Sequence, residues 1–316
     1  MPAKATLRQI RAVIAVCEEG SFTRAAAREH ATQSGISQHV SAVEKSLGVA
    51  LFDRNTANGA VPTPAGLRYY RQCVEAIGML ERAAEDLRAL NGAVTGPLRI
   101  GLMPTFTRAA LAPTLQHFVP AYPDVGLHIT EAYSGTLTDK VLADELDFAI
   151  VPAFEGRTGL KSRLILRDRE VLMSGPASGF KPLRPLQLAQ CPPLKLIVPG
   201  PENIRRRNLD TYCQTHGVRI ARMIEMDAMM ATFDLVSRTD FVTILPGLIC
   251  MNDIGSETLC INPIDPPLHA DFIVITPSRR TLSTPAKLFL QLFEADLKKA
   301  AETLTRLWKA PKAKRK

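Results

Sequence analysis

The hydrophobic pattern changes once, at the stretch Asn91–Pro97, and this change constrains the fold more than any other feature. Before it, apolar residues recur every three or four positions, which is typical of amphipathic helices. After it, short apolar runs alternate with helical stretches, which is typical of βαβ units. The stretch itself, Asn-Gly-Ala-Val-Thr-Gly-Pro, has the composition of a linker. The sequence therefore predicts a largely helical N-terminal part and a separate α/β part.

The first part of the chain predicts three helices joined by tight turns. A helical apolar stripe over residues 6–18 stops at Gly20, and glycine commonly ends a helix. Ser21 can cap a short second helix, and Thr32 can cap a third that runs to about Leu47. The outer face of the third helix is small and polar, as in a helix-turn-helix that reads DNA bases. An ordinary three-helix cluster with a polar face stays open at this point.

The next segment favours a wing beside those helices. A turn-rich stretch over residues 53–59 is followed by Thr63-Pro64, a strong helix start. A helix, a small hairpin and a helix make a winged helix-turn-helix, with Arg54 at the base of the wing facing the phosphates.

An unbroken helical pattern then runs from Pro64 to Leu90, about 40 Å of helix. Its apolar seam has near-heptad spacing and is too long for the small winged domain to bury, so we expect a coiled-coil-like dimer contact. Packing against the C-terminal domain of the same chain is the alternative. The seam consists of Leu67, Tyr70, Val74, Ile77, Leu80, Ala84 and Leu87.

Beyond the linker the pattern predicts two α/β units. The order strand, helix, strand, helix, strand over residues 98–151 implies a parallel sheet with helices on its faces. A second unit follows from about residue 163, and a final helix is expected at about 285–299. Two such units make a two-lobed ligand-binding domain with a hinge.

Composition and charge limit the function classes. Hydrophobic residues make up 46 % and charged residues 22 %, as in a folded globular protein, and no apolar run is long enough for a membrane span. We expect no secretory signal, and six cysteines without a CxxC pair fit a reducing cytoplasm. The net charge of +8 includes five basic groups in residues 309–316. That tail either holds nucleic acid electrostatically or is simply solvated.

No catalytic or metal-binding set stands out, so we expect no enzyme, no metal and no cofactor. The six histidines lack metal-ligand spacing, and there is no GxSxG, P-loop or GxGxxG motif. A solute-binding protein would share the two-lobed fold but would have no use for residues 1–90. A general nucleoid-type DNA binder would leave about 200 residues of α/β structure unexplained.

Two long runs of residues resemble the LysR-type transcriptional regulators. The first is Thr32-Gln33-Ser34-Gly35-Ile36-Ser37-Gln38-His39-Val40, with Gly20-Ser21-Phe22-Thr23-Arg24-Ala25-Ala26 before it and Thr63-Pro64-Ala65-Gly66 after it. The second is a set of C-terminal motifs: Pro97-Leu98-Arg99-Ile100-Gly101, Glu145-Leu146-Asp147-Phe148-Ala149-Ile150 and Ile244-Leu245-Pro246. The likeness covers about residues 6–300. Glu131-Ala132-Tyr133-Ser134-Gly135-Thr136 loosely fits the nitrogen-assimilation-control-like branch.

The resemblance implies an α+β multidomain protein that binds double-stranded promoter DNA as a homodimer or homotetramer, works with RNA polymerase and does not enter membranes. A small-molecule effector between the lobes would change transcription. The implied domains are a winged helix-turn-helix (1–62), a linker helix (63–92), a periplasmic-binding-protein-like effector domain (93–300; lobe I about 97–162 and 268–300, lobe II about 163–267) and a basic tail (301–316).

Site residues are carried over by motif. The implied base readers are Thr32, Gln33, Ser34, Ser37, Gln38 and Ser41, and the implied backbone contacts are Arg28, Lys45 and Arg54. The family's wing usually ends in Leu-Thr, whereas this one ends in Pro62-Thr63. Pro62 lacks an N–H, so we expect a shorter or reshaped wing.

Physical reasoning and the resemblance point to the same ligand site. Ligands of open α/β sheets bind where strands end and helices begin, and free N–H groups there attract anions. We therefore expect a carboxylate ligand. The hydroxyls of Thr105 and Ser134 match the positions where the family's hydroxyls meet the ligand, but they can instead merely cap their helices. The expected effector residues are Pro104, Thr105, Phe106, Ser134, Gly135, Thr136 and Asn203.

Redox sensing is the alternative mode of regulation. Some members of the family sense peroxide with a cysteine pair in the second lobe, and Cys213 lies roughly where one of that pair would be. No cysteine occurs in residues 200–206, and Cys250 and Cys260 are better interpreted as core residues.

Overall fold

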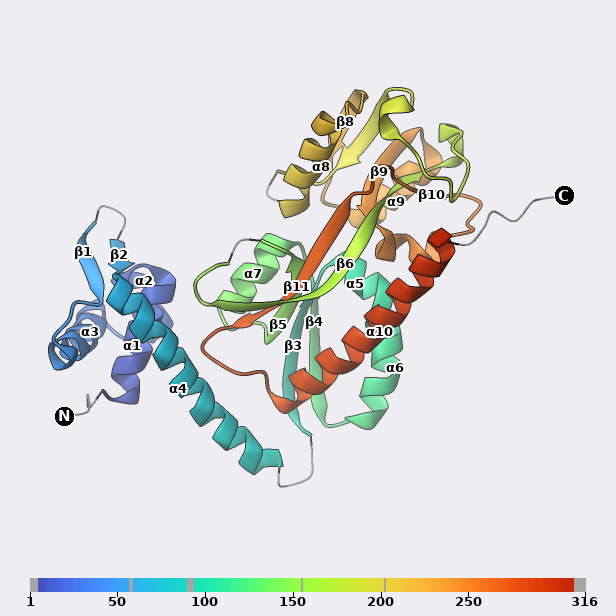
Figure 1. Cartoon of the computed structure of the whole chain (residues 1–316). Coiled ribbons are helices and arrows are strands. Elements are labelled where there is room, and N and C mark those ends of the chain that lie inside the picture. Colours follow the sequence, from blue (N-terminus) through green and yellow to red (C-terminus); the bar gives the residue numbers. More distant parts are fainter. Residues whose placement is uncertain (1–4, 57–58, 90–93, 155, 202, 310–316) are drawn as a thin grey trace. The chain divides into compact units, whose positions relative to one another are not determined.

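The computed structural model describes the chain except residues 1–4, 57–58, 90–93, 155, 202 and 310–316 (Figure 1). Two units emerge from its contacts. The first comprises Met1–Gly92 with two later segments, Gly156–Lys161 and Pro277–Leu282. The second comprises Ala93–Glu155, Ser162–Thr276 and Ser283–Lys316.

The first unit begins with three helices that start and stop where the sequence predicts. They are α1 (Leu7–Glu19), α2 (Phe22–Arg28) and α3 (Gln33–Leu47). Each is capped by the hydroxyl of the residue before it, and the Thr32 hydroxyl accepts a hydrogen bond from the Gly35 N–H at 3.1 Å. Gly20 ends α1 with a φ of 60°, a left-handed conformation that suits glycine. The predicted helix-turn-helix is confirmed.

A two-stranded wing and a long helix complete the N-terminal part. The antiparallel strands β1 (Phe52–Thr56) and β2 (Gly59–Pro62) pair Phe52 with Pro62, and their register shifts between Asp53 and Thr56. The helix α4 (Pro64–Ala89) is capped by Thr63, whose hydroxyl accepts a hydrogen bond from the Gly66 N–H at 3.0 Å. A Cβ at Gly66 would lie 2.0 Å from the Leu51 carbonyl oxygen, so only glycine allows α4 to start this close to the wing.

The core of this unit takes in the first half of α4. It is built from Val13, Val16, Ile36, Val40, Val43, Phe52, Tyr70, Cys73, Val74 and Ile77, all buried. The winged domain therefore buries part of the α4 seam, at Tyr70, Val74 and Ile77, but not all of it. Leu67 and Leu80 are 39 % and 54 % exposed. The side chains of Ala84 and Leu87 lie outside the described residues.

The second unit is built on one mixed sheet, ordered β4-β3-β5-β11-β6-β9-β7-β8 with β10 beside β6. One half contains β3 (Gly96–Leu102), β4 (Val125–Glu131), β5 (Phe148–Pro152) and β11 (His269–Pro277); the other contains β6 (Leu160–Ser174), β7 (Leu194–Val198), β8 (Ile220–Glu225), β9 (Phe241–Pro246) and β10 (Cys260–Pro263). β3 is parallel to β4 and β5, as the βαβαβ order predicts. β11 returns antiparallel to β5, so the chain re-enters the first half at its end.

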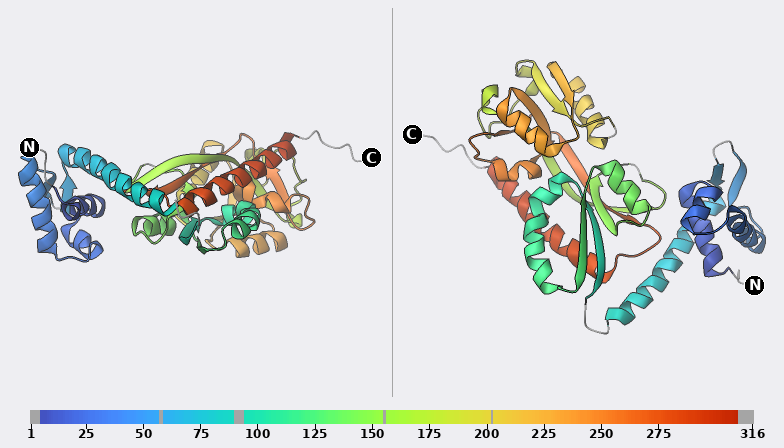
Figure 2. Two further views of the ribbon diagram at one scale, coloured as in Figure 1. Left: turned by 90° about the horizontal axis from the view of Figure 1, so that it is seen from below. Right: turned by 180° about the vertical axis from the view of Figure 1, so that it is seen from behind.

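Helices cover the faces of this sheet (Figures 1 and 2). The α-helices are α5 (Pro104–Phe106), α6 (Ala112–Ala121), α7 (Ser134–Leu142), α8 (Ile204–Thr215), α9 (Met229–Arg238) and α10 (Thr284–Lys309). A π-helical turn, η1 (Thr107–Leu111), joins α5 to α6, and the 3₁₀ turns are η2 (Pro176–Ser178), η3 (Leu188–Gln190) and η4 (Gly247–Asp253). Among the residues described, no helix has the length and hydropathy to cross a membrane.

The final helix is longer than the sequence predicts. α10 continues to Lys309, so the prediction that the tail begins at residue 301 is wrong for residues 301–309. Apolar positions continue past 299, and Leu304 is buried while Trp308 packs on the core of the second lobe. The rest of the predicted tail, residues 310–316, lies outside the described residues.

Candidate DNA interface and effector cleft

The third helix has one apolar and one polar face. α3 buries Ile36, Val40 and Val43 in the core of the winged domain, which turns its opposite face outward. Of the predicted DNA contacts on α3 and at its N-cap, Thr32, Gln33, Ser34, Gln38 and Lys45 are exposed, and Ser37 and Ser41 are half-buried. Side chains that can bond base edges and phosphates therefore share one face of a single helix.

Two groups hold α3 in place. The Thr32 hydroxyl caps the helix and lies 3.2 Å from the Ser34 hydroxyl. At the other end, Glu44 Oε1 accepts hydrogen bonds from the Leu51 N–H at 2.8 Å and the Phe52 N–H at 3.2 Å. Glu44 thus ties α3 to the wing. Sequence reasoning missed it because a glutamate on a helix ordinarily faces solvent.

Arg28 has a different place from the one predicted for a phosphate contact. Its guanidinium pairs with Glu18 at 2.6 Å and with Glu19 at 3.1 Å, and its side chain is 16 % exposed. The pattern of a basic residue at a helix end gave no sign of two carboxylates ten and nine positions earlier. Arg54 lies on β1, and its side chain is outside the described residues.

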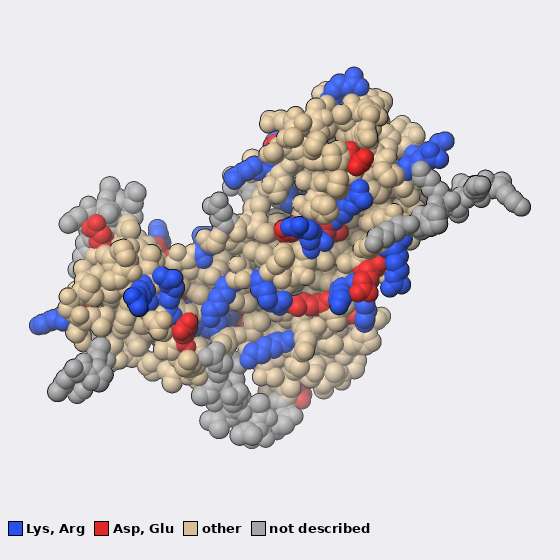
Figure 3. All heavy atoms as spheres, in the orientation of Figure 1, with Lys and Arg blue, Asp and Glu red and all other residues tan. Residues whose placement is uncertain are grey.

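One face of the molecule shows how charged side chains are distributed there. On the face drawn in Figure 3, Lys and Arg are scattered, with Asp and Glu among them in several places.

A cleft in the second unit gathers part of the predicted ligand site. Pro104, Thr105 and Asn203 line it. Its other walls are Met103, Tyr133, Ile197, Val198, Pro199, Arg205, Met226, Met229, Thr232, Thr243 and Leu245, which sequence reasoning missed. These residues come from both halves of the sheet, so no local pattern could bring them together. The space these residues enclose is about 20 Å³, far below the roughly 300–1,000 Å³ of typical small-molecule sites.

The remaining predicted effector residues lie elsewhere. Phe106 is fully buried and packs edge-on against Phe272, with ring centroids 4.9 Å apart. Gly135 and Thr136 are exposed on the first turn of α7. Ser134 is 1 % exposed, and its hydroxyl has no hydrogen-bond partner among the described residues.

Capping explains only one of the polar groups. Asn203 caps α8, since its Oδ1 accepts a hydrogen bond from the Arg205 N–H at 3.0 Å. The helices that begin beside Thr105 and Ser134 have no side-chain cap. Both hydroxyls are buried just after the carboxyl ends of β3 and β4, which run parallel with Leu102 opposite Glu131.

A buried ion pair lies beside the cleft, with Arg205 in its wall. Arg205 donates to both oxygens of Glu170, at 2.9 and 2.6 Å, and to the Ile244 carbonyl at 3.1 Å. Both side chains are nearly inaccessible, at 6 % and 3 % exposed. Nearby, burial raises the pKa of Asp168 to about 7, against hydrogen bonds from the backbone. The Arg205 charge is thus balanced by Glu170.

Metal and thiol chemistry find little support. No group of three or more His, Cys, Asp or Glu suited to a metal occurs in the described part of the chain. All six cysteines are free and buried. Burial raises the pKa of the Cys213 thiol, which disfavours the reactive thiolate.

Curated relatives match much of the chain. The Streptomyces viridosporus probable hydrogen peroxide-inducible genes activator is 28 % identical over 249 residues, 76 % of this chain and 77 % of that protein. The Escherichia coli transcriptional activator protein LysR is 26 % identical over 306 residues, 96 % of each chain. The nitrogen assimilation regulatory protein nac of Klebsiella aerogenes is 29 % identical over 163 residues, 51 % of this chain and 53 % of that one.

A solved structure and two family matches agree with these relatives. A peroxide-bound mutant of Corynebacterium glutamicum OxyR superposes with a TM-score of 0.57 at 20 % identity, covering 96 % of this chain and 97 % of that one. Residues 7–67 match the bacterial regulatory helix-turn-helix protein, lysR family, and residues 91–298 match the LysR substrate binding domain. The second match spans more than half of the sequence. The chain therefore belongs to the LysR family: it is a transcriptional regulator, not an enzyme, with a DNA-binding helix-turn-helix and a substrate-binding domain.

Proposed function

We propose that this regulator binds promoter DNA as a homo-oligomer, a dimer or a tetramer, and acts on RNA polymerase from there. The polar face of α3 supports the DNA contacts: Thr32, Gln33, Ser34, Ser37, Gln38 and Ser41 for bases, and Lys45 for the backbone. Arg54, on β1, is a further backbone contact that we propose from the family motif. Exposed apolar side chains on α4, Leu67 and Leu80 among them, support a dimer contact. Residues 1–62, 63–92 and 93–300 would serve as the DNA-binding, linking and effector-binding parts.

The effector we propose is a small carboxylate bound in the cytoplasm. The observation that carries it is the buried Ser134 hydroxyl, which has no hydrogen-bond partner among the described residues and follows the strand beside the one that leads to Thr105. A buried hydroxyl without a partner is costly, and an anion that accepts hydrogen bonds removes that cost. Asn203 and the N-terminus of α8 add polar groups at the cleft. Methionines on the other walls suit an apolar body on the ligand.

Titration calorimetry with a panel of small mono- and dicarboxylates tests this assignment. We expect one class to bind the full chain, and its uncharged amide analogues to bind at least tenfold more weakly. The double variant Thr105→Ala/Ser134→Ala should lose binding, while Thr136→Ala, an exposed change on the same helix turn, should keep it. Equal carboxylate binding by the wild type and the double variant would contradict the proposed site.

Peroxide sensing is the second mode of regulation that the relatives' names suggest. Nothing in the described structure favours it, because Cys213 is only 6 % exposed and all six thiols are buried.

A further inference from the structure

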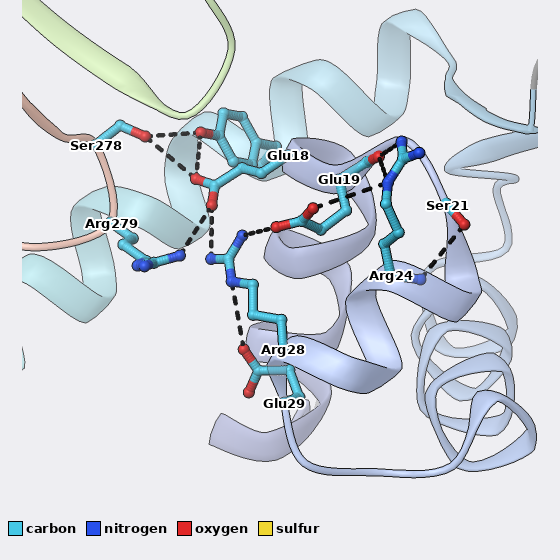
Figure 4. Close-up of polar contacts among 9 residues, drawn as sticks. Glu18, Glu19, Ser21, Arg24, Arg28, Glu29, Ser278 and Arg279 are labelled. Atoms are coloured by element: carbon cyan, nitrogen blue, oxygen red, sulfur yellow. Dashed lines mark hydrogen bonds and ion pairs between the residues drawn. The ribbon is translucent and has the colours of Figure 1, made fainter. Parts of the chain in front are cut away.

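One buried carboxylate in the first unit collects partners from distant parts of the chain (Figure 4). Glu18 lies in the last turn of α1, and its side chain is 4 % exposed. Its Oε2 pairs with Arg28 at 2.6 Å and with Arg279 at 3.4 Å. Its Oε1 accepts hydrogen bonds from the Tyr70 hydroxyl at 2.8 Å and the Ser278 hydroxyl at 3.3 Å. We call these five residues the Glu18 cluster.

The partners of Glu18 offset the cost of burying its charge. Burial raises the pKa of Glu18, while the charge of Arg28 and the hydrogen bonds from Tyr70, Arg28 and Ser278 oppose that rise. The hydroxyls of Tyr70 and Ser278 also lie 2.7 Å apart. Removing one partner from such a network leaves a buried charge poorly matched, so its members form and separate together. That property suits a contact with two discrete states.

One side of the cluster supports the recognition helix. Glu18 belongs to α1, which packs directly on α3. Arg28 is the last residue of α2, and only a short turn separates it from Thr32, the cap of α3. A displacement of Glu18 would therefore reach α3 through both helices that hold it.

The other side of the cluster is continuous with the strands at which the two halves of the sheet meet. Ser278 and Arg279 follow directly after β11, which ends at Pro277. The Ser278 N–H donates to the Gly159 carbonyl at 2.8 Å, and Gly159 immediately precedes β6. β6 and β11 are hydrogen-bonded neighbours at the centre of the sheet, one from each half.

We infer that the Glu18 cluster couples the DNA-binding helices to the two central strands, so that a ligand which moves the lobes alters DNA binding through Ser278 and Arg279. The regulatory consequence rests on the proposed function, whereas the coupling rests on the contacts alone. Coupling is reciprocal, so DNA bound at α3 must also change the local stability of the chain at the ends of β6 and β11.

Hydrogen–deuterium exchange of the full chain tests the coupling without a known effector. The double variant Ser278→Ala/Arg279→Gln removes the distant half of the cluster and leaves Glu18, Arg28 and Tyr70 in place. We expect amides in the last turn of α1 and in α2 to exchange at least tenfold faster in this variant. The matched control Arg238→Gln, an exposed charge at the end of α9, should leave them unchanged. Unchanged exchange in the double variant would overturn the inference.

A milder variant guards against misfolding. Tyr70→Phe keeps the ring in the core and removes only the hydroxyl, so it should speed exchange in the same amides by a smaller factor. If the double variant loses its circular-dichroism spectrum, this single change decides: faster exchange supports the coupling, and unchanged exchange refutes it.

Binding of DNA tests the coupling in the opposite direction. When promoter DNA binds the wild type, as anisotropy reports, exchange at residues 156–161 and 277–282 should change, and this response should vanish in the double variant. Bound DNA with no such response in the wild type would overturn the inference. Failure to bind any DNA would instead contradict the proposed function, and the free-protein comparison would still decide the coupling.

Discussion

Burial, more than any charged neighbour, sets the acidity of Asp168. Its carboxyl is 7 % exposed and accepts a hydrogen bond from the Leu248 N–H at 2.8 Å. The pKa of about 7 lies above the ordinary value of about 3.9 that the unfolded chain has. The folded state therefore binds the proton more tightly, and this group stabilises the fold below about pH 4 and loses that contribution as the pH rises through 7.

Replacing Asp168 should remove this pH dependence. Between pH 5 and pH 8 the wild type should lose unfolding free energy on the order of 1–3 kcal/mol relative to Asp168→Asn. Urea unfolding followed by the fluorescence of Trp308, the single tryptophan, measures the difference near this core. Parallel pH profiles for the two proteins would show that Asp168 is not protonated as described.

The six thiols predict indifference to peroxide. Cys213 is buried and its pKa is raised, so little thiolate is present at neutral pH. Millimolar hydrogen peroxide should change promoter binding by less than twofold, and Cys213→Ser should behave as the wild type. Anisotropy and intact mass before and after oxidation check this. Loss of binding together with an added oxygen at Cys213 would restore the redox alternative.

At the scale of elements, α3 should carry sequence preference. Gln33→Ala with Gln38→Ala should reduce the preference for the native site at least tenfold, since each base contact is worth about 1–3 kcal/mol. Lys45→Ala should weaken native and scrambled duplexes alike and reduce the salt dependence. Competition binding at two salt concentrations measures both effects. If the glutamine double variant lost affinity equally for the native and the scrambled duplex, those side chains would contact the DNA backbone and not the bases.

The exposed part of α4 should carry dimerisation. Met79 and Leu80 are 61 % and 54 % exposed, so more than half of each is open to solvent. Met79→Ser/Leu80→Ser should shift sedimentation towards the monomer at micromolar concentration. Leu7→Ser, which changes a residue that is 52 % exposed on α1, is the matched control. A dimer as tight as the wild type would place the contact elsewhere.

Elements with local signals were predictable, and those without were not. Caps and stops fixed α1, α2, α3 and α4, because Thr32, Thr63 and Gly20 act within a few residues of themselves. The edge strand β8 and the short β10 were missed, since their residues alternate weakly and depend on neighbouring strands. The π-helical turn η1 after Thr105 has no sequence signature.

At the scale of the whole molecule, long-range contacts bring together residues that no sequence pattern relates. The motif resemblance places Thr105 and Ser134 near the ligand, and both are buried at adjoining strand ends. The walls Met226, Met229 and Thr243 come from the other half of the sheet. Glu18 and Ser278 are 260 positions apart, which no periodicity can relate.

The regulatory function proposed for this protein depends on its specific recognition of DNA. Fluorescence anisotropy near 150 mM salt, with DNA from upstream of the protein's own gene and a scrambled duplex, measures it most directly. A preference of about 10³-fold or more for the native sequence, altered by a carboxylate that binds the cleft, is the predicted result. Equal, steeply salt-dependent binding to both duplexes would mean electrostatic attachment alone and would contradict the recognition assigned to α3 on this DNA.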